Sequence, residues 1–122
     1  MKALLIVAHG SRREQSNQEV LELANTLTQQ GNHGFDIIEA AFLELADTLI
    51  PDGIENCARR GATEIIVLPY FLNSGKHVTR DIPEVITAIK PLYPDINILL
   101  TQHIGASPVM LELILETATN KA

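Results

Sequence analysis

The sequence of 122 residues contains one cysteine, Cys57, and so cannot form an internal disulfide bond. Cys57 falls on the apolar face of an expected helix, where a small buried side chain is its expected role. No apolar run is long enough to cross a membrane, and the N-terminus enters a strand pattern without a secretory leader. We therefore expect a protein of the reducing cytoplasm with no membrane partner.

Several common binding and catalytic motifs are also missing. There is no Gly-x-Gly-x-x-Gly or Walker loop for nucleotide phosphates, no Gly-x-Ser-x-Gly elbow and no Cys-x-x-Cys pair. The formal net charge of −6 argues against nonspecific nucleic-acid binding, which needs a basic surface. We expect no nucleic-acid partner and no closed structural zinc site.

Apolar runs alternate with helical patterns along the chain. Runs of apolar residues predict strands at residues 3–8, 35–43, 64–68 and 96–100. Amphipathic periodicity predicts one helix that starts within residues 11–19 and ends at Gly31, and another near residues 49–60. The order of elements is therefore a strand followed by a helix, repeated.

The last two helices carry more specific start signals. The third is predicted over residues 82–89 and begins either at a capping pattern, residues 81–84, or earlier, near His77. Ser107 and Pro108 open the fourth helix, and its spacing places Met110, Leu113 and Ile114 toward the core.

Alternating strands and helices predict an α/β fold with a parallel sheet and helices on both faces. Because crossovers between parallel strands are right-handed, few topologies remain. We predict a single domain over residues 1–122, a flavodoxin-like three-layer sandwich with four parallel strands in the order 2-1-3-4.

This topology brings titratable side chains to one rim of the sheet. Ligands of open parallel sheets bind beyond the carboxyl ends of the strands. His9, Glu44 and His103 follow the first, second and fourth strands, and His77 lies in the long loop after the third. His33 falls at the opposite edge, as a loop residue. Glu44 can equally cap the next helix, and His103 can be a structural strand-end residue, which leaves His9 and His77 as the main candidates for a site.

Basic and hydroxyl side chains flank these two histidines. Ser11 and Arg12 follow His9 and suit an anion-binding turn at a helix N-terminus. Lys76 and Arg80 lie on either side of His77. These side chains either keep helix starts soluble or form a local positive field that recognises carboxylates.

The chain resembles the small sirohydrochlorin chelatases, the single-domain members of the class II tetrapyrrole chelatases. The matching stretches span nearly the whole sequence in family order. They are Leu5-Ile-Val-Ala-His-Gly-Ser-Arg12 with Asn17, Ala41-Phe-Leu-Glu-Leu-Ala46, Pro69-Tyr-Phe-Leu72, Gly75-Lys-His-Val78, Asp81-Ile-Pro83 and Ile104-Gly-Ala-Ser-Pro108. The pattern Gly-x-His-Val-x-x-Asp-Ile-Pro is the specific part.

The resemblance implies insertion of a divalent metal, cobalt or ferrous iron, into sirohydrochlorin, for cobalamin or sirohaem synthesis. It implies His9, His77 and Glu44 as catalytic residues, with His9 and His77 as metal ligands or proton acceptors across an open cleft. Ser11, Arg12, Lys76 and Arg80 are the expected substrate-binding residues. The metal would be a substrate, with no tightly bound cofactor, and imidazole and carboxylate groups accept cobalt, iron or nickel.

Larger members of that family contain two such domains, so we expect a homodimer. Two other functions remain compatible with the sequence. One is a noncatalytic metal or tetrapyrrole carrier of the same fold. The other is a histidine phosphatase, although that class has an arginine just before its histidine, where this chain has Ala8.

Overall fold

The computed structural model describes residues 1–120 as four strands that alternate with four helices. In chain order these are β1 (Lys2–Ala8), α1 (Glu14–Gln30), β2 (Ile37–Phe42), α2 (Ile50–Arg59), β3 (Glu64–Pro69), α3 (Ile82–Ile89), β4 (Asn97–Leu100) and α4 (Val109–Thr119). A π-helical turn at His77–Asp81 leads into α3, and a 3-10 turn at Ile104–Ala106 precedes α4. The predicted single domain ends at residue 122, and its last two residues lie outside the described part.

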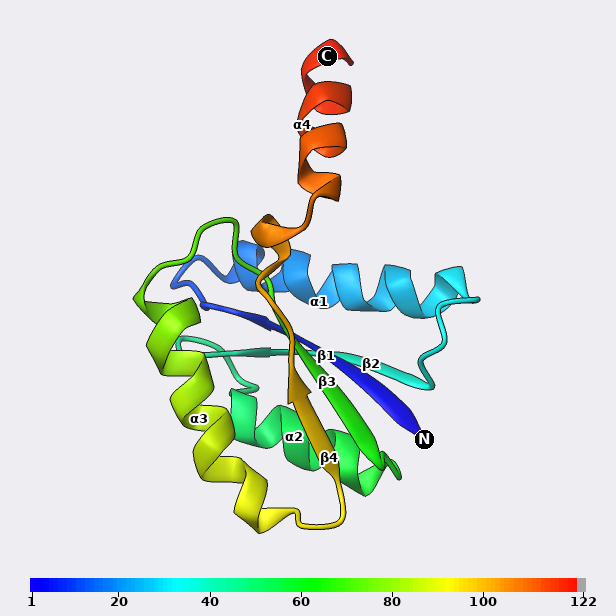
Figure 1. Cartoon of the computed structure of the whole chain (residues 1–122), viewed down its shortest axis with the longest axis vertical. Coiled ribbons are helices and arrows are strands. Elements are labelled where there is room, and N and C mark those ends of the chain that lie inside the picture. The colour runs from blue at the N-terminus through cyan, green and yellow to red at the C-terminus, as the bar shows by residue number, and fades with distance from the viewer. Residues whose placement is uncertain (121–122) are drawn as a thin grey trace.

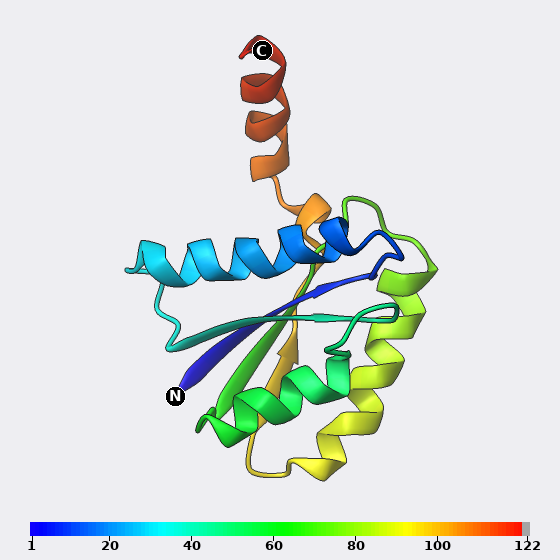
Figure 2. The same ribbon diagram turned by 180° about the vertical axis from the view of Figure 1, so that it is seen from behind.

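The predicted sheet is confirmed. All pairings are parallel, and the strand order is β2-β1-β3-β4. Helix α1 covers one face of the sheet, and α2 and α3 cover the other (Figures 1 and 2). The three layers therefore follow the flavodoxin-like arrangement that the alternating pattern indicates.

The two faces of β1 belong to two separate cores. The core under α2 and α3 includes Ala3, Leu5, Val7, Ile54, Cys57, Ile65, Val67, Ile82, Ile86 and Ile98. The core under α1 includes Ile6, Ala8, Val20, Ala24, Ile38, Ala40 and Phe42. Because side chains alternate across a strand, a central strand buried on both faces has to be apolar throughout. Cys57 is fully buried, as predicted.

The start of α3 resolves the alternative that the sequence left open. The helical backbone begins at His77 with one π-helical turn and continues through Pro83, which lies in the first turn of α3. Asp81 has right-handed helical dihedrals, with φ −64° and ψ −48°, so it lies within the helical segment rather than at its start. This places Asp81 four residues after His77 on one helical face.

Helix α4 corrects one prediction. Met110, Leu113 and Ile114 do not face a core: Leu113 is 52% exposed, Ile114 is 56% exposed, and no residue of α4 is buried. The helix extends away from the sheet and the other helices in both views (Figures 1 and 2). Periodicity identifies an apolar helix, but it does not identify the surface that covers it.

No helix in residues 1–120 is both long and apolar enough to span a bilayer.

Candidate active site

The loops that follow β1 and β2 continue the pairing of their strands. The amide of Leu43 donates to the carbonyl of Ala8 at 3.0 Å, and the amide of Glu44 donates to the carbonyl of His9 at 3.1 Å. The sheet therefore extends by backbone bonds as far as the first catalytic candidates. His9 and Glu44 are brought together by the register of the two strands.

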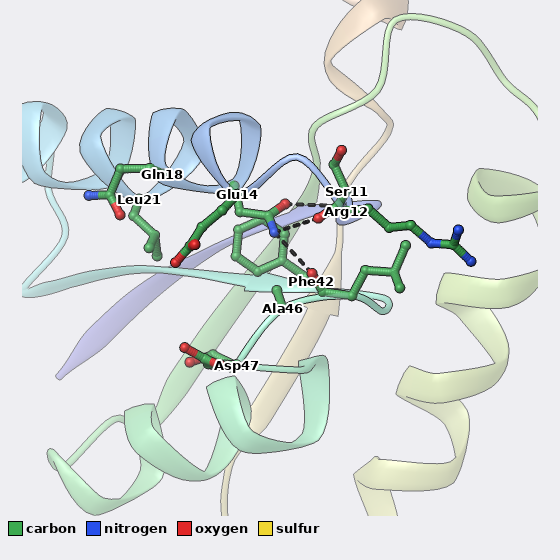
Figure 3. Close-up of a pocket in the computed structure, with 11 residues that line it drawn as sticks. Ser11, Arg12, Glu14, Gln18, Leu21, Phe42, Ala46 and Asp47 are labelled. Atoms are coloured by element: carbon green, nitrogen blue, oxygen red, sulfur yellow. Dashed lines mark hydrogen bonds between the residues drawn. The ribbon is translucent and has the colours of Figure 1, made fainter.

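Two residues hold this arrangement at close range. Gly10 has φ +96°, and a Cβ atom there would lie 1.7 Å from the carbonyl oxygen of Glu44. Only glycine allows the two loops to approach this closely. The Asn17 amide nitrogen donates to the carbonyls of Ser11 and Leu45, both at 2.9 Å, and its oxygen accepts from the amide of Ser11 at 2.8 Å. Asn17 thus ties the start of α1 to both loops, through hydrogen bonds that Figure 3 draws as dashed lines.

The side chains of His9 and Glu44 form a hydrogen-bonded pair. His9 Nε2 lies 2.9 Å from Glu44 Oε2, with the two side chains 42% and 55% exposed. An ionised carboxylate only accepts hydrogen bonds, so Nε2 of His9 is the donor. In the neutral ring the lone pair then resides on Nδ1, which makes no hydrogen bond to another residue within positions 1–120.

A second histidine–carboxylate pair forms within the π-helical turn. His77 Nδ1 lies 2.7 Å from Asp81 Oδ2, and the second oxygen of Asp81 lies 3.4 Å from Arg80 Nε. The hydrogen bond from His77 lowers the pKa of Asp81, and the nearby charges of Arg80 and Lys76 act in the same direction. Asp81 is therefore an ionised acceptor at neutral pH, which leaves the lone pair of neutral His77 on Nε2.

The two imidazole rings are in contact. The ring centroids of His9 and His77 lie 4.4 Å apart with an interplanar angle of 29°, and Phe71 lies 6.3 Å from His77 on the same loop. The two histidines face each other as predicted. The predicted cleft between them is absent, because the two rings stack directly on each other. Residues 1–120 hold no preformed group of three or more metal-binding side chains.

The four expected substrate-binding residues do not share one cavity. Ser11 and Arg12 line a pocket of about 470 Å³ between the first turn of α1 and the loop after β2, together with Glu14, Phe42 and Asp47. In Figure 3 the guanidinium of Arg12 points away from Glu14. Lys76 directly precedes the π-helical turn and Arg80 lies within it; both are exposed, and neither lines this pocket.

The other two histidines lie apart from this pair. His103 is half-buried before the 3-10 turn, and no described contact joins it to His9 or His77. His33 lies in the loop before β2, as predicted, where its Nδ1 accepts the amide of Phe35 at 3.1 Å.

Sequence reasoning missed Asp81 as a member of the site. The sequence does contain a pattern that predicts it. Asp81 follows His77 by four residues, and this spacing brings the two side chains together in any helix that begins at His77. Interpreting residues 81–84 as a capping pattern hid that signal.

Known proteins share both the sequence and the fold. A sirohydrochlorin ferrochelatase of Arabidopsis thaliana, described as chloroplastic, is 32% identical over 111 residues, which cover 91% of this chain and 48% of that protein. A sirohydrochlorin cobaltochelatase of Methanocaldococcus jannaschii is 37% identical over 90 residues, covering 74% and 62%. The sirohydrochlorin chelatase SirB of Bacillus subtilis subspecies spizizenii, solved in complex with cobalt, superposes with a TM-score of 0.85 at 31% identity, covering 99% of this chain and 51% of that one.

The chain thus spans about half the length of several of the relatives that it matches. The CbiX family model matches residues 3–121, almost the full sequence. The chain therefore belongs to the CbiX family.

Proposed function

We propose that this protein inserts a divalent metal, cobalt or ferrous iron, into sirohydrochlorin. Relatives that match most of the chain are named as sirohydrochlorin ferrochelatases and cobaltochelatases. The observation that carries the proposal is the stacked pair of imidazoles, each with one nitrogen held by a carboxylate and the other unengaged.

Metal insertion needs side chains that can bind a divalent ion and side chains that can accept protons. An incoming ion has to exchange water ligands for ring nitrogens, and two pyrrole N–H protons have to leave the macrocycle. Neutral imidazole binds borderline divalent metals and also accepts protons near neutral pH. His9 Nδ1 and His77 Nε2 are the two atoms that could take either role.

The stacking suggests how the two roles divide. A lone pair of imidazole lies in the plane of its ring, so two stacked rings present their lone pairs side by side rather than toward one point. One ion therefore binds both rings only after a ring turns. We infer that one histidine ligates the metal while the other accepts a proton. Glu44 and Asp81 fix the tautomer and orientation of the rings and pass protons outward.

Substrate recognition has to overcome the acidic character of the chain. Sirohydrochlorin carries many carboxylates, and the protein has a net charge of −6. Arg12, Lys76 and Arg80 are exposed and follow or flank His9 and His77 in the sequence. In this proposal they supply a local positive field for the substrate carboxylates, with Ser11 as a neutral donor.

The functional unit that we propose is a homodimer in the cytoplasm. Several relatives are about twice as long as this chain, so a second copy would supply the other half of the assembly. His9 and His77 are 42% and 38% exposed in one chain, which leaves room for a macrocycle and a second wall. A strict monomer with full activity at high dilution would contradict this part of the proposal.

The test is anaerobic incubation of the purified protein with sirohydrochlorin and cobalt, ferrous iron or nickel, followed by absorbance. His9→Ala and His77→Ala should each lower the initial rate about 10²–10⁴-fold, because each removes a ligand or proton acceptor. Glu44→Gln should be milder. Both histidine variants should keep the wild-type circular dichroism spectrum. Wild-type rates in a folded double variant would refute the site, and binding of sirohydrochlorin without metal insertion would indicate a carrier.

A further inference from the structure

Leu45 has a backbone conformation that leucine rarely adopts. Its φ is +57°, in the left-handed region, and within residues 1–120 Asn32 is the one other non-glycine residue with a positive φ. Asparagine tolerates this region because its short polar side chain can hydrogen-bond locally, which leucine cannot do. The Leu45 side chain is 46% exposed, so burial in a core does not offset the strain. Another contact has to hold this backbone in place.

The strained residue directly follows Glu44, at the point where the chain turns back. Before it, the amide of Glu44 donates to the carbonyl of His9 at 3.1 Å. After it, the carbonyl of Thr48 accepts the amide of Phe42 at 3.0 Å, so the loop has already returned to the end of β2. A change in the dihedral angles of Leu45 would therefore redirect the chain beside Glu44 and move its carboxylate.

The side chain that holds Leu45 is Asn17. Its amide nitrogen donates to the carbonyl of Leu45 at 2.9 Å and to the carbonyl of Ser11 at 2.9 Å, and its oxygen accepts the amide of Ser11 at 2.8 Å. These bonds use both N–H groups of the amide, so the orientation of the side chain is fixed. Asn17 is half-buried and belongs to α1, so a helix carries the group that binds both loops.

The two loops that Asn17 joins carry the two members of one hydrogen-bonded pair. Ser11 is two residues after His9, and Leu45 is one residue after Glu44. The net stabilisation from one hydrogen bond is comparable to the cost of a left-handed conformation in a leucine. The bond from Asn17 to Leu45 is therefore strong enough to offset the strain, and its loss would allow the loop to relax.

We propose that Asn17 is a positioning residue: it holds Leu45 in the left-handed conformation and thereby keeps the Glu44 carboxylate on Nε2 of His9. With Nε2 engaged as a donor, the lone pair of neutral His9 stays on Nδ1, the atom that binds metal or accepts a proton in the proposed reaction. The expected effect on rate rests on the proposed function. The expected effect on the tautomer of His9 does not.

Kinetics of the full-length protein test the effect on rate. Asn17→Ala should lower kcat for metal insertion about 10²-fold, the usual effect of a displacement of about 1 Å, and should leave KM for sirohydrochlorin nearly unchanged. Asn17→Asp keeps the shape of the side chain but loses both donated bonds, so it should have the same effect, and it serves if the alanine variant does not fold. Gln18→Ala is the matched control, because Gln18 is the next residue of α1 and is exposed, and it should keep the wild-type kcat.

Substitutions at Leu45 separate positioning from a general structural role. Glycine adopts a left-handed conformation without strain, so Asn17→Ala/Leu45→Gly should recover at least about 10-fold of the lost kcat. Leu45→Val should lower kcat even with Asn17 intact, because a β-branched residue strongly disfavours a positive φ. A folded Asn17→Ala variant with wild-type kcat would overturn the proposal, and so would a double variant that is no faster than Asn17→Ala.

The tautomer of His9 can be measured without metal or substrate. The nitrogen chemical shifts of its ring, assigned by their loss in His9→Gln, show which nitrogen carries the proton. At about pH 8, where an ordinary imidazole is neutral, the wild type should carry the proton on Nε2, and Asn17→Ala should be a mixture of both tautomers. The same tautomer in both proteins would overturn the proposal. The expected change of tautomer in a protein that inserts no metal would count against the chelatase proposal alone.

Discussion

The contact between Gly10 and Glu44 allows a sharp test of how the fold positions the site. Alanine at position 10 would place a Cβ atom 1.7 Å from the carbonyl oxygen of Glu44, on a backbone with φ +96°. Gly34 provides a matched control, since it has φ +82° and nothing within 4 Å of its would-be Cβ atom. The two substitutions share the cost of a left-handed backbone and differ in the clash.

The expected effects follow from these contacts. Gly34→Ala should cost about 1–2 kcal/mol of unfolding free energy, the usual cost of a left-handed conformation. Gly10→Ala should cost the same and also strain the two backbone bonds that join the loops, each worth about 1 kcal/mol. The difference of about 2 kcal/mol corresponds to a melting temperature lower by about 8 °C for a domain of this size.

The activity of the two variants should differ more than their stability. Displacing Glu44 from His9 by about 1 Å can cost about 10²-fold in rate, whereas Gly34 lies at the opposite edge of the sheet. Differential scanning calorimetry and the anaerobic insertion rate measure the two effects. If Gly10→Ala and Gly34→Ala show equal melting temperatures and equal rates, the loop contact does not position the site.

Three further predictions concern other parts of the molecule. Asp81→Asn should lower the metal-insertion rate about 10-fold, because the His77 ring loses the carboxylate that orients it. Asp95→Asn, at an exposed carboxylate, is the control and should leave the rate unchanged. Equal insertion rates in the two variants would exclude a positioning role for Asp81. Neutral replacement of Arg12 should raise KM for sirohydrochlorin more than it lowers kcat. The affinity of the wild type for sirohydrochlorin should fall as the salt concentration rises. Binding that does not depend on salt would contradict recognition of the substrate carboxylates. Burial raises the pKa of the Cys57 thiol from 9.0 to about 12. Between these two pH values the thiol ionises only in the unfolded chain, so the free energy of unfolding should fall by about 1.4 kcal/mol per pH unit. Urea unfolding at several pH values from about 8 to 11 measures this pH dependence, and a Cys57→Ala variant should lack the part of it that the thiol contributes.

The strands were predictable because burial on both faces leaves a strong mark on the sequence. The run at residues 3–8 is apolar at every position, and β1 lies between two strands and two helix layers. The edge strands were less accurate. The expected strand at residues 35–43 is shorter in the structure, Ile37–Phe42, because Phe35 and Asp36 lie before the ladder begins.

The strand order predicts which residues lie at the carboxyl-end rim of the sheet, but it does not predict the contacts between their side chains. Placing His9 and His77 at the carboxyl ends of neighbouring strands needs only the strand order. Their stacking at 4.4 Å depends on the helical start at His77, which the sequence left open. The same choice decides the partner of Asp81: a helix that starts at residue 81 would use this carboxylate as a cap, and one that starts at His77 turns it toward the imidazole.

Helix α4 shows the limit of patterns within one chain. Its apolar spacing is genuine, but no residue of α4 is buried, so the prediction that its apolar face covers a core of this chain is wrong. Its anchor at Gly105 contacts Phe71 and Leu72, the loop that also carries His77. Any surface that covers α4 would therefore act, through this anchor, on the loop that carries one of the two catalytic candidates.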